Sequence, residues 1–433
     1  MPTSSPPPDP PMDPFSNPVG PDGADGVEYP GQTVSLEDDQ FATAPNRPVR
    51  PDPVVIPGPG PFEAFAWLIG VIIVHLVASA IMVVLVAAVV VGISGDQQLA
   101  QDPGRLQKMI NEHIGVVMGG DQVLFVLVVL LAVGLRLAVP FDRSAGPLSR
   151  LGNRLGRLRI CPQHLLTIAV IVVPVSVACG QLFVAANRLW RGLLETLPGL
   201  PDVPAIQEVN VLATMAEGLS LPGMVFVLAV LPAVGEELVF RGVIGRGLVA
   251  RGGVVHGIFL TSLLFAMAHI NPAHAMSVFP LGVLLHVVHL ATRSILAPIL
   301  LHFLINGWAA VLTKATLSMP NRGIDPALLG GEEVLPWFVL VPASLASFCA
   351  VVYFWKSRIE FRVPGDAPSF SRNPRADHVR WWWPAYRSVE VPRGPAEAVR
   401  LKPPVELTVA LGVGLLCFYV ALGWEVSRAA GGG

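Results

Sequence analysis

The chain has 433 residues, of which 52% are hydrophobic and 14% are charged, and its mean hydropathy is +0.60. Because an ordinary soluble domain carries roughly 25% charged residues, this composition excludes a plain soluble globular protein. The 29 Lys and Arg nearly balance the 31 Asp and Glu, and the absence of a basic stripe argues against nucleic acid as a partner.

Residues 1–60 are expected to form a disordered, acidic tail. They hold 16 of the 42 prolines and nine acidic residues, but only two basic ones, Arg47 and Arg50. Such a composition cannot bury enough apolar surface to fold. No basic segment followed by an apolar one occurs in this tail, so we expect no cleavable signal peptide and insertion that begins with the first membrane helix.

Nine apolar runs follow the tail, several of them near the roughly 20 residues that a helix needs to cross a bilayer. They cover residues 62–93, 122–140, 164–185, 221–248, 254–271, 276–292, 294–313, 335–355 and 404–425. These runs predict an all-α, polytopic transmembrane bundle of about eight to nine spans, the range reflecting two short runs between 254 and 292. We divide the chain into the tail (1–60), N-terminal helices (61–200), a core (201–320) and C-terminal helices with a basic loop (321–433).

The loops differ in basic content, which predicts the topology. Loop 141–163 holds five arginines and loop 356–403 holds ten Lys or Arg, whereas the other long loops hold two each. The positive-inside rule therefore places both basic loops, and with them the N-terminus, in the cytoplasm, in what is expected to be the cell membrane. The second basic loop contains Trp381, Trp382 and Trp383, which suit a headgroup anchor; a substrate-docking strip is the alternative.

Charges interrupt one apolar run. In LAVLPAVGEELVFRGVIGRG, Glu236, Glu237 and Arg241 lie in a predicted membrane helix, where each ionisable group costs on the order of 3 kcal/mol. Glu237 and Arg241 are four residues apart and can form an ion pair on one face. Glu236 is offset by about 100° and can face a cavity. The alternative is a helix end at the interface with solvated charges.

Two further polar groups stand in later apolar runs. His269 follows Phe265 by one turn in TSLLFAMAHINP, and His302 and Asn306 share a helix face in HFLIN. A lone histidine in an apolar helix is more often structural than catalytic. Together, however, a carboxylate, two imidazoles and an amide in a low-dielectric bundle can activate a water and stabilise an oxyanion.

The order of these groups resembles a known family. The motifs E-E-x-x-x-R, F-x-x-x-H and H-x-x-x-N occur at 236–241, 265–269 and 302–306, within 71 residues of hydrophobic helix. They resemble the CAAX protease and bacteriocin-processing (CPBP, or Abi) family of intramembrane proteases, to which the eukaryotic Ras-converting CAAX endopeptidase belongs. The resemblance covers roughly residues 220–313.

The resemblance implies an intramembrane endopeptidase that hydrolyses a peptide bond of a membrane-associated protein or peptide, of prenylated CAAX type or bacteriocin type. Glu236 would be the general base on a water, with His269 positioning that water. Glu237 and Arg241 would hold the helix, and His302 with Asn306 would stabilise the oxyanion. The spacings are compatible with a Zn²⁺ bound by Glu236, His269 and His302, and equally with a water held by the glutamate without metal.

A rival hypothesis is a catalytically inactive membrane scaffold or a transporter that retains the fold, because intramembrane charges also mark transport paths. A transporter would more commonly show repeated halves, and an inactive relative would be expected to have lost a motif residue. Other polar groups are interpreted as structural or solvated: His286, His289, His256, His274, Glu332 and Glu333.

Straight membrane spans would place Glu236 and His269 at different depths in the bilayer. On the predicted boundaries, Glu236 and His269 would differ in depth by about 15 Å. Their meeting requires a tilted or broken helix pair, which Pro232, Gly235 and Pro272 permit.

Overall fold

The computed structural model describes residues 33–35, 59–95, 102–138, 160–197, 214–318, 334–362 and 397–431. In these ranges, eight helices are long and apolar enough to cross a membrane, and a shorter apolar helix covers Arg251–Met267. The prediction of a polytopic helical bundle with about eight to nine spans is therefore confirmed. The chain is an integral, multi-pass membrane protein.

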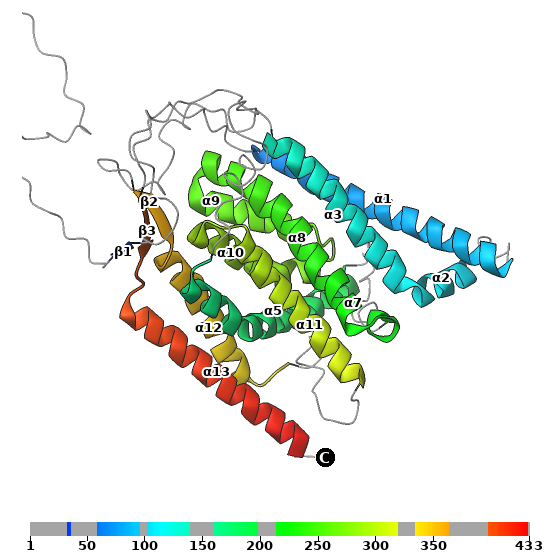
Figure 1. Ribbon diagram of the computed structural model, residues 1–433. Helices are drawn as coiled ribbons and strands as arrows, with labels where there is room; N and C mark the ends of the chain where they lie inside the picture. The colour runs from blue at the N-terminus through cyan, green and yellow to red at the C-terminus, as the bar shows by residue number, and fades with distance from the viewer. Residues whose placement is uncertain are drawn as a thin grey trace, which may run out of the picture.

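The helices form a central group with an arm on one side (Figure 1). The elements, in chain order, are α1 (Pro61–Ser94), α2 (Pro103–Glu112), α3 (Ile114–Ala138), α5 (Pro162–Thr196), α7 (Leu221–Val225), η2 (Phe226–Val230), α8 (Leu231–Glu237), η3 (Leu238–Gly245), α9 (Arg246–Met267), α10 (Pro272–Thr292), α11 (Leu296–Ser318), α12 (Trp337–Lys356) and α13 (Val405–Gly431). Helices α1 and α3 pack together as the arm, and α13 packs on α12 at the other side.

The outer helices present apolar side chains outward. On α1, Leu76 is 62% exposed and Val84 is 66% exposed, which in water would be an unfavourable surface. The central helices instead bury theirs, with Phe240 and Phe265 almost fully enclosed. This pattern is that of a bundle whose rim contacts lipid and whose centre contacts protein.

A small antiparallel sheet departs from the all-helical expectation. Its strands β1 (Thr33–Ser35), β3 (Glu397–Leu401) and β2 (Ile359–Arg362) lie in that order. Residues 356–403 were predicted as a loop and the tail as disordered. Strands this short have no periodic pattern of their own in the sequence. They form here because β3 pairs with both β1 and β2. The remainder of the basic loop, including the three tryptophans, and nearly all of residues 1–60 lie outside the described residues.

This sheet gathers several chain segments at one end of the bundle. Arg400 of β3 contacts Gln163 at the start of α5, and the Arg293 Nε–H donates to the carbonyl of Ile359, 3.2 Å away. The strand from the tail therefore lies at the same end of the bundle as the start of α5, which follows loop 141–163, and as the two strands of segment 356–403. That arrangement agrees with the common side assigned to them by their basic residues.

A reversal at Gly253 overcomes the depth difficulty. Gly253 has φ 81° and ψ 173° inside α9, a backbone conformation open almost only to glycine, so α9 consists of two helices joined by a sharp turn. Glu236 lies 17 residues before this turn and His269 lies 16 residues after it. The two arms return to nearly the same depth. The turn lies in the gap between the predicted runs 221–248 and 254–271, so the depth difference expected for straight spans was wrong, and the boundaries were not.

Candidate active site

The helix that carries the two glutamates is irregular at both ends. Helix α8 lies between two π-helical segments, η2 and η3, a feature often found at functional sites. Pro232 has no backbone N–H, so the carbonyl of Leu228 lacks its usual helical partner. The Asn306 side-chain amide donates to that carbonyl at 3.1 Å, which ties α11 to the break.

Arg241 is fully buried and bonded to two elements. Its NH1 group donates to Glu237 Oε1 at 2.7 Å, and its NH2 group donates to the Gly282 carbonyl of α10 at 3.0 Å. Its guanidinium lies 4.5 Å from the centre of the Phe265 ring of α9. The ion pair predicted from the i, i+4 spacing thus exists, and it fixes three neighbouring helices around the motif.

Glu237 also fixes the imidazole of His302. The same Oε1 atom accepts a hydrogen bond from His302 Nδ1 at 3.0 Å. Because an ionised carboxylate only accepts hydrogen bonds, Nδ1 must carry the proton. Nε2 of the neutral ring is then left with a free lone pair. This hydrogen bond fixes the orientation of the His302 ring.

His269 is held in an equivalent way by the backbone. Its Nδ1 lies 3.0 Å from the carbonyl of Phe265, so Nδ1 is again the protonated nitrogen and Nε2 is left available. The next residue, Ile270, has φ 60°, which for a β-branched residue costs on the order of 1–3 kcal/mol. This strained residue turns the chain sharply into α10 directly after the imidazole.

Glu236 is the acidic group not used in the ion pair. Its Oε2 atom is buried and has no hydrogen-bond partner among the described residues. The electrostatic partners of its carboxylate include His302, His75, Glu237 and Arg241. Glu237 also has a buried Oε2 without a partner, but its Oε1 is bonded to Arg241 and His302, whereas neither oxygen of Glu236 makes a hydrogen bond among the described residues.

The structure brings Glu237, Arg241, His269 and His302 together, with Glu236 next to Glu237 in the chain and Asn306 one turn after His302. Phe265 links them, since its ring centre lies 5.2 Å from that of His269 and 5.9 Å from that of His302. The roles assigned to these residues remain predictions.

Two histidines near the predicted site residues were not assigned to the site from the sequence. The ring of His274, interpreted as a solvated span end, lies 4.5 Å from that of His269. His75 of α1 interacts electrostatically with Glu236 and was not identified. A signal existed, because His75 and Asp121 are ionisable groups within apolar helices, where such groups are costly.

The remaining histidines have varied surroundings. His289 Nδ1 lies 3.2 Å from the Ser294 carbonyl, in keeping with a structural role, and His256 is exposed. His286 is buried, and neither of its ring nitrogens has a partner within the part of the chain that the structure describes. The structural hydrogen bond expected for His286 is thus not formed. Glu332 and Glu333 lie outside the described residues.

Glu236, His269 and His302, the expected zinc ligands, have suitable chemistry but do not lie close enough together. Their chemistry is suitable, since both imidazoles have Nδ1 bonded and Nε2 free, as metal-bound histidines commonly do. Across the described ranges, however, no three His, Cys, Asp or Glu side chains are grouped closely enough to hold a metal ion. The spacing of Glu236, His269 and His302 therefore does not fit a formed zinc site, and no step below is assigned to zinc.

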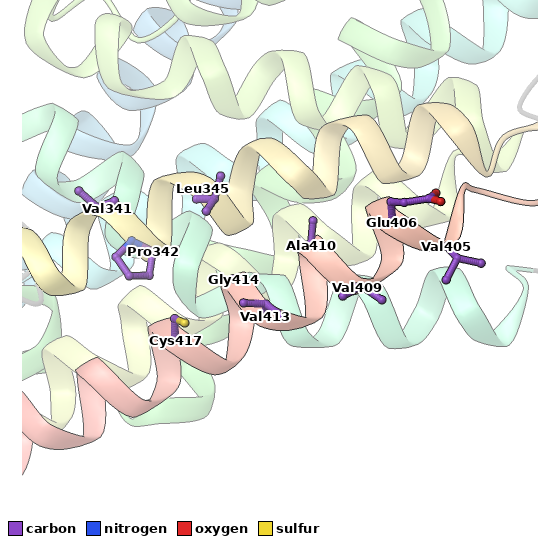
Figure 2. Close-up of a pocket in the computed structure, with 10 residues that line it drawn as sticks. All are labelled: Val341, Pro342, Leu345, Val405, Glu406, Val409, Ala410, Val413, Gly414 and Cys417. Carbon is purple, nitrogen blue, oxygen red and sulfur yellow. The ribbon is translucent and has the colours of Figure 1, made fainter.

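Two apolar grooves are lined by none of the six predicted site residues. One, of about 670 Å³, lies between α12 and α13 and is shown in Figure 2, with Glu406 and Cys417 among its lining residues. The other has the same volume and is lined by residues of α5, α10 and α12, among them Phe279 and Leu340. Both linings are almost wholly apolar and suit contact with lipid chains.

Comparison with known proteins gave one match. Residues 218–308 match the family described as Type II CAAX prenyl endopeptidase Rce1-like. The matched segment holds all six predicted site residues. No curated protein and no solved structure matches the chain.

Proposed function

Because the chain belongs, through residues 218–308, to the Rce1-like family of type II CAAX prenyl endopeptidases, we propose that it is an intramembrane endopeptidase. It hydrolyses a peptide bond of a membrane-associated protein or peptide. The supporting observation is the pair of glutamates with different environments. Both have a buried Oε2 without a partner, but Glu237 is bonded through Oε1 to Arg241 and His302, whereas Glu236 makes no hydrogen bond among the described residues.

In the proposed reaction, Glu236 is the general base. Its carboxylate takes a proton from a water as the water oxygen attacks the carbonyl carbon of the substrate. His269 holds that water through its free Nε2. The proton then passes from Glu236 to the leaving nitrogen as the C–N bond breaks, which regenerates the carboxylate.

The oxyanion of the tetrahedral intermediate is assigned to α11. The Asn306 amide has two N–H groups, and one of them is used on Leu228, so the other is available to the substrate. His302, oriented by Glu237, supports the same oxygen when its Nε2 is protonated. Groups fixed in advance in this way are effective because they need no reorganisation during the reaction.

Substrate class follows from the family description. A prenylated protein with a CAAX-type C-terminus is the leading substrate, and a bacteriocin-type peptide is the second. Both are membrane-associated, which suits a site in a bundle of apolar helices.

The test compares peptide termini in the membrane proteomes of cells with the intact protein and cells with Glu236→Gln. Removal of the general base is expected to lower the rate of substrate cleavage by a factor on the order of 10² to 10⁴. A peptide terminus found only in cells with the intact protein therefore identifies the substrate and the bond that is cleaved. Glu406→Gln, at an exposed carboxylate of α13, is the matched control and should leave that terminus in place.

Retained cleavage by Glu236→Gln at normal abundance would refute the assignment of the base. Identical termini in all three cell lines would instead favour the inactive scaffold or the transporter. Metal analysis of the purified protein, with activity measured before and after chelation, decides whether zinc has a part in the reaction.

A further inference from the structure

The helices α1 and α3 carry a buried polar pair outside the segment that matches the family. His75 Nδ1 lies 3.0 Å from Asp121 Oδ2, and the Ser79 hydroxyl donates to Asp121 Oδ1 at 3.1 Å. The Asp121 side chain is 4% exposed and that of His75 is 30% exposed. Ionisable groups within apolar membrane helices are costly and are retained mainly for function.

This pair is stacked against the helix that carries Glu236. The ring of His75 lies on that of Phe125, with centres 4.1 Å apart and planes 28° apart. Phe125 in turn presses on α8, since a Cβ at Gly235 would lie 2.5 Å from Phe125 Cε1. Only glycine allows this approach, and Glu236 is the next residue.

Electrostatics point to the same neighbour. His75 is, with His302, Glu237 and Arg241, one of the titratable groups that act electrostatically on the Glu236 carboxylate. Each of these imidazoles has a carboxylate bonded to Nδ1, Glu237 for His302 and Asp121 for His75. Such a partner sets the tautomer and the ring orientation, and the Nε2 of the neutral ring then carries a lone pair and no proton.

We propose that His75, oriented by Asp121, is a positioning residue of the active site that fixes Glu236 from the side of α1, through the Phe125 ring on which it is stacked and the contact of that ring with Gly235. The inference rests on the proposed endopeptidase function and extends its site to helices that the family match does not cover. It also accounts for the buried carboxylate of Asp121.

The alternative is that the pair merely joins α1 to α3. A second link between these helices provides the control, because Arg136 Nε lies 2.6 Å from Glu63 Oε1 and neither residue is part of the proposed site. Glu63→Gln weakens the packing of α1 on α3 without removing a group from the site.

The experiment uses the full-length protein in lipid nanodiscs and a fluorogenic, farnesylated peptide with a CAAX-type C-terminus. His75→Ala is expected to lower kcat about 10- to 100-fold, the loss typical when a group that orients a catalytic side chain is removed, with KM changed less than twofold. Asp121→Asn should lower kcat less. The double variant should lose no more than His75→Ala alone, because Asp121 acts through His75.

Thermal unfolding of each variant is measured in parallel. Glu63→Gln should lower Tm while kcat stays within twofold of the wild-type value. Full activity of His75→Ala beside an inactive Glu236→Gln overturns this inference alone. A fall in kcat for Glu63→Gln equal to that of His75→Ala also overturns it, in favour of packing. Failure of the wild-type protein to cleave the probe overturns the CAAX-type substrate, and full activity of Glu236→Gln overturns the assignment of Glu236 as base and this inference with it.

Discussion

Single side chains in this bundle compensate for defects in the helices beside them. The carbonyl of Leu228 has no N–H from residue 232, and Asn306 supplies the missing donor from another helix. An unmade buried hydrogen bond costs about 1–3 kcal/mol, and lipid offers no water to replace it. Asn306 therefore stabilises the irregular helix in addition to the role proposed for it in catalysis.

A double-mutant cycle at these residues separates the two roles. Asn306→Ala is expected to lower the free energy of unfolding by about 1–3 kcal/mol, because the Leu228 carbonyl loses its donor. In the background of Pro232→Ala, whose backbone N–H can reach that carbonyl, the same change should cost about 1 kcal/mol less. Denaturant unfolding in micelles measures both. Equal costs in the two backgrounds would show that the amide does not act on the carbonyl.

Residue spacing predicted the ion pair of Glu237 and Arg241, because i, i+4 geometry depends only on a helix being present. It could not predict that Gly282 accepts from Arg241, since that contact depends on how closely α10 approaches η3. His75 was missed for a similar reason. Its relation to Glu236 passes through Phe125, and no motif spacing records a contact between helices so far apart in the chain.

At the scale of the elements, the hairpin at Gly253 decides where the motif histidine lies. Its two arms, η3 with the start of α9 and the remainder of α9, pack so that the rings of Phe240 and Phe265 lie 5.3 Å apart, edge to face. The apolar runs predicted the existence of both arms. The gap between the runs 221–248 and 254–271 predicted a break here but not the residue that makes it, because Gly252 and Gly253 are adjacent and sequence does not show which of them leaves the helix.

That turn supports a matched pair of substitutions. Gly253→Ala is expected to destabilise the protein by about 1–3 kcal/mol, because alanine is strained at φ 81° and the strain has no outlet in a packed hairpin. Gly252→Ala should be neutral or slightly stabilising, since Gly252 is in the helical conformation and alanine favours it. Thermal melting compares the two. Equal effects would contradict the assigned position of the turn.

At the scale of the whole molecule, the termini of α1, α3, α5, α12 and α13 alternate between two ends. The small sheet marks one end, through strands from the tail and from the two sides of loop 363–396. The positive-inside rule assigns this end to the cytoplasm. Eight long helices and the short arm of α9 then place residue 431 at the opposite end.

Thiol labelling tests this topology. In a background without the four native cysteines, Ser149→Cys and Ser371→Cys are expected to resist a membrane-impermeant maleimide in intact cells and to react once the membrane is opened. Gln97→Cys, in the loop after α1, should react in intact cells. The reverse pattern would invert the orientation, and labelling of all three positions would contradict a single membrane topology.

The glycine turn has a consequence for how this chain can vary in length. Glu236 and His269 lie at nearly the same number of residues from Gly253, one in each arm, so the length of each arm sets the position of its catalytic group. An insertion of one residue in either arm would move its group by about 1.5 Å and rotate it by about 100°. Homologues that keep the chemistry should therefore keep both arm lengths, or change them together.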